Sequence, residues 1–253
     1  MKTMNQWLLR SVFAVLMLGG SLQAVAQERA AMESWLCNYT EGKGHADLMK
    51  VAAKWQKWAE KNNPAPYEAY VLTPVFATFE EVPQSIWIGF SPTSAEMGAV
   101  ADTWMNEGGD LMGDFNDVVQ CGAHTLGSSR AVRAYEKAGE AGVVQLSACS
   151  VNKGVSWAQV AAADKAFADY LTEHELPGGV YRWGAGPGTP KDSEIDFYSV
   201  WITESLEQRG AALDKWRTIE SAAQDMYAIY GDDNLYTCDK PRIYYGVPVG
   251  GSE

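Results

Sequence analysis

The chain has 253 residues, of which 47% are hydrophobic and 11% aromatic, and its 20 basic and 32 acidic side chains give a formal charge of −12. This excess of acid argues against nucleic acid as a partner, because Lys and Arg must neutralise its phosphates. It also argues against anionic membrane surfaces. We interpret the charge as a solubilising surface.

The first 26 residues have the pattern of a secretory signal peptide. Lys2 and Arg10 give a positive start, Val12–Leu18 is apolar, and Ala24–Ala26 is a small-residue cleavage site. The alternative is an N-terminal membrane anchor, but the apolar run is short for a span, which takes about 20 residues. Cleavage would leave 18 basic and 32 acidic side chains, a charge of −14. We therefore expect a bacterial protein that is periplasmic or secreted, with no membrane association after cleavage.

The chain contains an internal repeat. Cys37–Gly42 recurs as Cys149–Gly154, at an offset of 112 residues. The same offset relates eight further pairs: Trp55 and Phe167, Trp58 and Tyr170, Thr93 and Ser205, Glu96 and Gln208, Gly98 and Gly210, Ala99 and Ala211, Asp102 and Asp214, Trp104 and Trp216. A repeat of this length indicates a duplicated domain. We expect a signal peptide at 1–26, a first repeat at 27–126, a connection at 127–142 and a second repeat at 143–253.

Four cysteines in an exported chain indicate two disulfides. Three pairings are possible, and the duplication selects Cys37 with Cys121 and Cys149 with Cys238, because each half then keeps the same topology. A zinc site is the alternative. It fails on spacing, since there is no C-x2-C pair and the three histidines do not lie beside the cysteines in both halves. We therefore predict no metal site.

Hydrophobic periodicity predicts a β-α-β-β-α-β order in the first half. Strands are expected at 33–40, 67–76, 85–90 and from 119. A helix from Ala46 to Lys61 has its apolar residues at helical spacing: Leu48, Val51, Ala52, Trp55 and Ala59. Thr93 and Glu96 form a capping box that begins a helix through Met105. A short helical piece follows the Gly-Gly break and ends near Val118.

The second half repeats this order. Strands are expected at 143–151, 180–183, 197–202 and from 236 to about 245, and 184–191 is a Gly-rich loop between two strands. Capping boxes at Ser156–Gln159 and Ser205–Gln208 begin two helices, and 219–230 is helical as well.

A split β-α-β-β-α-β unit is the ferredoxin-like pattern, in which the first and last strands are antiparallel neighbours. Cys37 and Cys121 would then lie on adjacent strands, within bonding distance. The helices cover one face of each sheet, and the other half's sheet covers the second face. The arrangement resembles the dimeric α/β-barrel superfamily in a single-chain, tandem fused form, and it also resembles exported bacterial proteins of unassigned role. The expected fold is α+β: two tandem ferredoxin-like units packed sheet to sheet as a pseudo-dimeric α/β barrel.

Strand alternation divides the central strands into two faces. Trp87, Phe197 and Trp201 share a face with small polar residues, and we expect this face to line a cavity between the sheets. The opposite face, with Ile86, Ile88, Phe90, Tyr198, Val200 and Ile202, is expected to pack under the helices. The cavity would bind a small apolar or aromatic molecule, or its aromatic side chains would simply fill the interface. The candidate lining residues are Tyr39, Trp87, His124, Arg182, Trp183 and Trp201.

The superfamily that the chain resembles includes monooxygenases that use no cofactor and haem proteins with a histidine axial ligand. Of His45, His124 and His174, only His124 is placed to face the barrel. The standard nucleophile, zinc-protease, P-loop and dinucleotide motifs are absent. We predict no haem or other cofactor. Three hypotheses stay open: an exported protein that binds a small molecule, a monooxygenase-like or haem-dependent enzyme, and a non-catalytic structural envelope protein.

Overall fold

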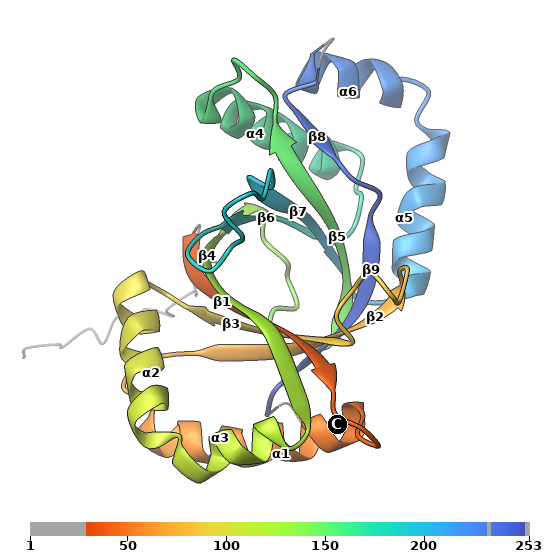
Figure 1. The fold of residues 1–253 in the computed structure, drawn as a ribbon. Coiled ribbons are helices and arrows are strands. Elements are labelled where there is room, and N and C mark those ends of the chain that lie inside the picture. The colour runs from red at the N-terminus through yellow and green to blue at the C-terminus, as the bar shows by residue number, and fades with distance from the viewer. Residues whose placement is uncertain (1–28, 232–233, 251–253) are drawn as a thin grey trace, which may run out of the picture.

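The computed structural model describes residues 29–231 and 234–250, which form six helices and nine strands (Figure 1). The predicted signal peptide, 1–26, lies outside these residues. The elements in chain order are β1 (Arg29–Tyr39), α1 (His45–Asn62), β2 (Glu68–Phe76), β3 (Ser85–Ser91), α2 (Ser94–Glu107), α3 (Gly109–Asn116), β4 (Val119–Arg133), β5 (Gly142–Val151), α4 (Trp157–Glu173), β6 (Gly179–Ala185), β7 (Phe197–Thr203), α5 (Leu206–Thr218), α6 (Ala222–Tyr230), β8 (Tyr236–Cys238) and β9 (Arg242–Pro248). No helix in the described part of the chain is long and apolar enough to cross a membrane.

The described strands close into an eight-stranded antiparallel barrel, in the order β5-β7-β6-β4-β1-β3-β2-β9 and back to β5, with β8 paired to the far end of β5. Within each half the order is last-first-third-second, the ferredoxin-like order. The helices of the two halves lie on opposite sides of the barrel (Figure 1). This confirms the predicted fold class, two β-α-β-β-α-β units that form one α/β barrel.

Two seams join the halves by backbone hydrogen bonds. β4 pairs with β6, and β2 pairs with β9, so each unit's edge strands are satisfied by the other unit. A sheet edge that is paired in this way offers no free row of N–H and C=O groups for aggregation. The halves therefore meet along their edges as well as facing each other across the interior.

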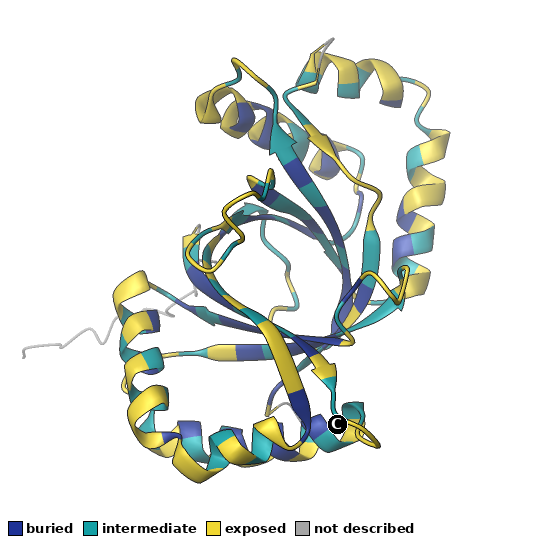
Figure 2. Ribbon diagram, viewed as in Figure 1, coloured by how far each residue is buried: buried dark blue, intermediate teal, exposed yellow. Residues whose placement is uncertain are grey.

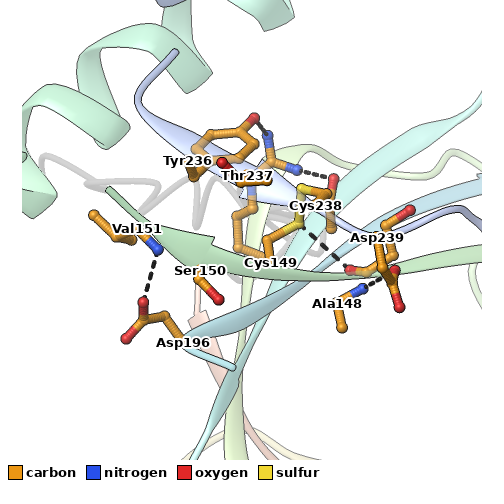
Figure 3. Close-up of a disulfide and its surroundings, with 12 residues drawn as sticks. Ala148, Cys149, Ser150, Val151, Asp196, Tyr236, Thr237, Cys238 and Asp239 are labelled. Carbon is orange, nitrogen blue, oxygen red and sulfur yellow. Dashed lines mark hydrogen bonds between the residues drawn. A yellow bond between two sulfur atoms is a disulfide. The ribbon is translucent and has the colours of Figure 1, made fainter. Parts of the chain in front are cut away.

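Both predicted disulfides are confirmed, Cys37–Cys121 between β1 and β4 and Cys149–Cys238 between β5 and β8. In each half the bridge therefore joins the first strand to the last, as the duplication implied. Figure 3 shows the second bridge, where the carboxylate of Asp239 accepts the Ala148 backbone N–H at 2.8 Å.

Local sequence signals set the helix boundaries. The hydroxyls of Thr93, Ser156 and Ser205 each accept the backbone N–H three residues later, which satisfies one of the unpaired donors at a helix start. The predicted apolar stripe of α1 is also its buried set, and it packs on the first half's sheet. In Figure 2 the dark, buried residues follow the strands and the inward helix faces.

Two boundaries differ from the prediction. β4 continues to Arg133, well past residue 126, because its second part pairs with β6 across the seam. The connection between the halves that lacks regular structure is therefore 134–141. The last strand is divided into β8 and β9, and Pro241, which has no backbone N–H to donate, lies in the break.

Candidate functional site

A cavity of about 200 Å³, open to solvent on one side, extends from the barrel surface between the two sheets. Its apolar wall comes from both halves, with Leu72, Ile88, Val144 and Ile202 on four different strands. These side chains belong to the buried cluster of the barrel interior, which mixes residues of the two units. The cavity therefore exists only because the two sheets close into one barrel.

Four aromatic side chains form a second wall of this cavity: Tyr70, Phe90, Tyr181 and Trp183. The ring of Phe90 lies 6.1 Å from that of Tyr70 and 5.9 Å from that of Trp183. Ring pairs at these separations attract each other beyond the area they bury, so the wall is held in place.

Residues 134–141, which we call the strap, form a third wall. The Tyr135 backbone N–H donates to the Tyr181 hydroxyl at 2.7 Å, and the Gly139 N–H donates to the Tyr70 hydroxyl at 2.9 Å. Lys137 forms an ion pair with Glu204 at 2.7 Å. Two hydroxyls of the aromatic wall thus fix the backbone of the strap beside the cavity.

Acidic side chains occur where the cavity meets solvent. Glu68 and Glu140 are exposed and contribute to its lining. Burial, with a contribution from Glu68, raises the pKa of Tyr70, and burial and Glu204 raise the pKa of Tyr135. Burial raises the pKa of Tyr181 as well. The three phenols therefore stay protonated at neutral pH and line the cavity as neutral groups.

Of the six residues predicted to line the cavity, Trp183 does so. Trp87 instead packs under α1, with its ring 4.9 Å from that of Trp55, and Tyr39 packs against the same helix-covered cluster. Trp201 packs on the helix side of the second sheet, where the Arg209 guanidinium lies 5.0 Å from its ring.

The predicted assignment of the two faces was therefore wrong, because the aliphatic and tyrosine face of β3 and β7 turns inward and the tryptophan face turns towards the helices. β3 shows the physical reason. Six of its seven residues are buried, so both faces of the strand lack exposed polar positions. Alternation then separates the faces but does not indicate which one is internal.

Arg182 also lies on the helix side, 5% exposed. Its Nε and Nη2 donate to the Asp164 carboxylate of α4 at 3.1 and 2.7 Å, and Nη1 donates to the Ser199 hydroxyl at 2.6 Å. The rings of Phe197 and Tyr236 lie 5.5 Å from its guanidinium carbon. This residue is fully engaged in holding α4 on the sheet.

His124 belongs to a polar network on the helix side of the first half. Its Nε2 lies 2.6 Å from Glu33 Oε2, and its ring stacks on Trp35 with the centroids 3.5 Å apart. Tyr67 donates to the other Glu33 oxygen at 2.5 Å and accepts the indole N–H of Trp87 at 3.0 Å. The nearly buried Glu33 carboxylate is therefore satisfied on both oxygens, as a buried charge requires.

The network predicts alkaline destabilisation. Burial first, and then Glu33, raise the pKa of Tyr67 well above its ordinary value of about 10. A raised pKa means that the folded state holds a proton that the unfolded state releases above pH 10, so this contribution to stability is present below pH 10 and is lost as pH rises further. Above pH 10 we expect the unfolding free energy of the parent chain to fall with pH more steeply than that of Tyr67→Phe. The expected difference between the two slopes is about 1.4 kcal/mol per pH unit. Urea titrations between pH 9 and 11.5 measure both slopes, and equal slopes would contradict the assignment.

The histidines do not suit a haem ligand. His45 Nδ1 lies 3.2 Å from the Thr73 hydroxyl, His174 caps α4 against Tyr170, and His124 is bonded to Glu33. Among the described residues that line the cavity, no histidine occurs. Nor do the described residues contain a group of three side chains that could hold a metal ion. The residues present therefore do not fit haem at this cavity.

Solved structures share the fold. A provisionally assigned monooxygenase from Lactobacillus acidophilus superposes with a TM-score of 0.52 at 11% identity, over 87% of this chain and 94% of that one. An anthrone oxidase-like protein gives 0.51 at 10% identity, over 90% and 96%. A provisionally assigned monooxygenase from Fusobacterium nucleatum gives 0.51 at 6% identity, over 87% and 92%. No protein-family model and no curated protein matches the sequence. These structural similarities show that this chain has the dimeric α/β-barrel fold.

Proposed function

We propose that this protein binds one small apolar or aromatic molecule in the barrel cavity. The observation that carries the proposal is the cavity itself, about 200 Å³ with one aliphatic and one aromatic wall. Drug-sized ligands occupy about 300–1,000 Å³, whereas an engineered apolar cavity of about 150 Å³ takes benzene. The part of the ligand that the cavity encloses is therefore about the size of a substituted single ring.

Monooxygenase-like catalysis is the second candidate. It is favoured by the fold shared with proteins provisionally named monooxygenases and with an anthrone oxidase-like protein, at identities that support a common fold alone. The titratable side chains at the cavity are the protonated tyrosines and the charged groups near its opening. This lining supports binding more directly than it supports acid-base chemistry. The structural envelope hypothesis predicts no ligand, so the binding experiment below separates it from both.

Export and gene duplication are further parts of this proposal. Disulfides persist in oxidising compartments, so the two bridges support a periplasmic or secreted protein. Removal of the first 26 residues is supported by their signal-peptide pattern. The identical strand order of the two halves supports a tandem fused form of a barrel that two chains would otherwise build. Mass spectrometry of the mature chain tests the first point, and an N-terminus other than Gln27 would count against it.

Binding is tested with tert-butylbenzene as the probe, by equilibrium dialysis of the full mature chain. We expect saturable binding of one molecule per chain, and a loss of affinity of at least about tenfold in Val144→Phe, which fills the cavity from β5. Leu213→Phe, an exposed position on α5, is the matched control and should bind as the parent does. Absence of saturable binding in the parent, or equal binding in Val144→Phe, would reject the proposal.

A further inference from the structure

The aromatic wall has the composition of a site for an organic cation. Tyr70, Phe90, Tyr181 and Trp183 line the same small cavity, and the ring of Phe90 lies within 6.1 Å of the rings of Tyr70 and Trp183. An aromatic face carries negative charge density, so several faces around one space attract a cation that has left water behind.

The acidic side chains around the opening of the cavity also favour a cationic ligand. Glu68 and Glu140 line the cavity and are exposed, and neither forms an ion pair among the described residues. Lys137 is the basic residue in this lining, and its ammonium is paired with Glu204. The carboxylates also act on the wall, since Glu68 contributes to raising the pKa of Tyr70 and Glu140 contributes to raising that of Tyr135, in both cases after burial.

We infer that the barrel cavity selects a small organic cation, an alkylammonium or aromatic ammonium compound, over a neutral molecule of the same shape. This inference rests on the proposed function, because it names the ligand class of the same cavity. A neutral ligand gains only the burial of its apolar surface. An ammonium ligand of equal size gains that burial, the attraction of the aromatic faces and the attraction of the two carboxylates. Anions are repelled by the same carboxylates, and the net charge of −12 acts in the same direction at longer range.

Phenyltrimethylammonium and tert-butylbenzene form a matched pair of probes, because they have the same shape and differ by one charge. We expect the cation to bind the full mature chain about tenfold more tightly in low salt, with the preference reduced by added salt. Glu68→Gln and Glu140→Gln should each weaken the cation about threefold or more and leave tert-butylbenzene unchanged. Phe90→Leu, which keeps an apolar wall but removes one ring, should reduce the preference as well. Glu107→Gln, at the end of α2, is the matched acidic control.

The outcomes separate the two proposals. If tert-butylbenzene does not bind, the proposed function fails, and this inference fails with it because it compares two probes in the same cavity. If tert-butylbenzene binds as tightly as the cation, or more tightly, the cavity is a ligand site but this inference is overturned. Cation binding that Val144→Phe does not reduce would place the cation on the acidic surface and would also overturn it. Cation binding that Val144→Phe abolishes and that Glu68→Gln and Phe90→Leu weaken supports it.

Discussion

Replacing Asp164 with asparagine is expected to lower the free energy of unfolding by about 3–5 kcal/mol, because it removes the anion between two buried or partly buried arginines. Asp164 is 1% exposed on α4. One of its oxygens accepts from Arg182, and the other accepts from Arg130. Arg130 and Arg182 are directly opposite each other in the ladder between β4 and β6. Without the carboxylate, two like charges face each other on adjacent strands, which destabilises the pair further.

Denaturant unfolding measures this effect. The control is Asp169→Asn on the same helix, whose ion pair with Lys165 is exposed on both sides and is expected to contribute less than about 1 kcal/mol. Hydrogen exchange should also show faster opening of the β4–β6 seam in Asp164→Asn. Equal losses for the two variants would mean that the buried cluster does not hold the halves together.

Removal of either disulfide is expected to cost about 4 kcal/mol, since each bridge closes a loop of similar length, 84 or 89 residues. The variants are Cys37→Ala with Cys121→Ala, and Cys149→Ala with Cys238→Ala. The second should lose more than the first. Cys238 ends the three-residue strand β8, in which the Tyr236 hydroxyl accepts from Arg182 Nη2 at 3.1 Å. Loss of this bridge therefore also loosens the buried arginine cluster.

The two double variants serve as each other's control in urea unfolding and in hydrogen exchange. Faster exchange in Cys149→Ala with Cys238→Ala should include β8 and its ladder with β5, where Cys149 pairs with Cys238 and Val151 with Tyr236. If the second half stays protected from hydrogen exchange in Cys149→Ala with Cys238→Ala, β8 is held by its other contacts. The predicted difference in stability between the two double variants would then be wrong.

Local sequence patterns were sufficient to predict most helices and strands. The stripe of α1 and the three hydroxyl caps are short-range features, because a helix face and a helix start depend on residues three to eleven positions apart. The disulfides followed from the repeat, since only one pairing places an equivalent bridge within each half. None of these features depends on how the two halves are positioned relative to each other.

The cavity could not be predicted with the same success. Trp183 was identified, but Tyr70, Phe90 and Tyr181 were not, although Phe90 lies on a strand whose alternation was described correctly. The strap was interpreted as an ordinary connection because its role depends on two tyrosine hydroxyls 46 and 69 residues away in the chain. The Gly-rich loop after β6 lies along β4, where the Leu126 N–H donates to Pro187 at 2.8 Å, and this pairing has no sequence signature.

The sequence by itself determined the element order, the helix starts, the two disulfides and the α+β barrel class, because each of these depends on periodicity, on capping chemistry or on the repeat. The tertiary structure alone decided which face of each strand is internal. Strands such as β3 are buried on both faces, one by helices and one by the opposite sheet, so hydrophobicity is equal on the two sides. Closure of the barrel along the β4–β6 and β2–β9 seams decides which face is internal. It places the tyrosines, Phe90 and Trp183 around the cavity.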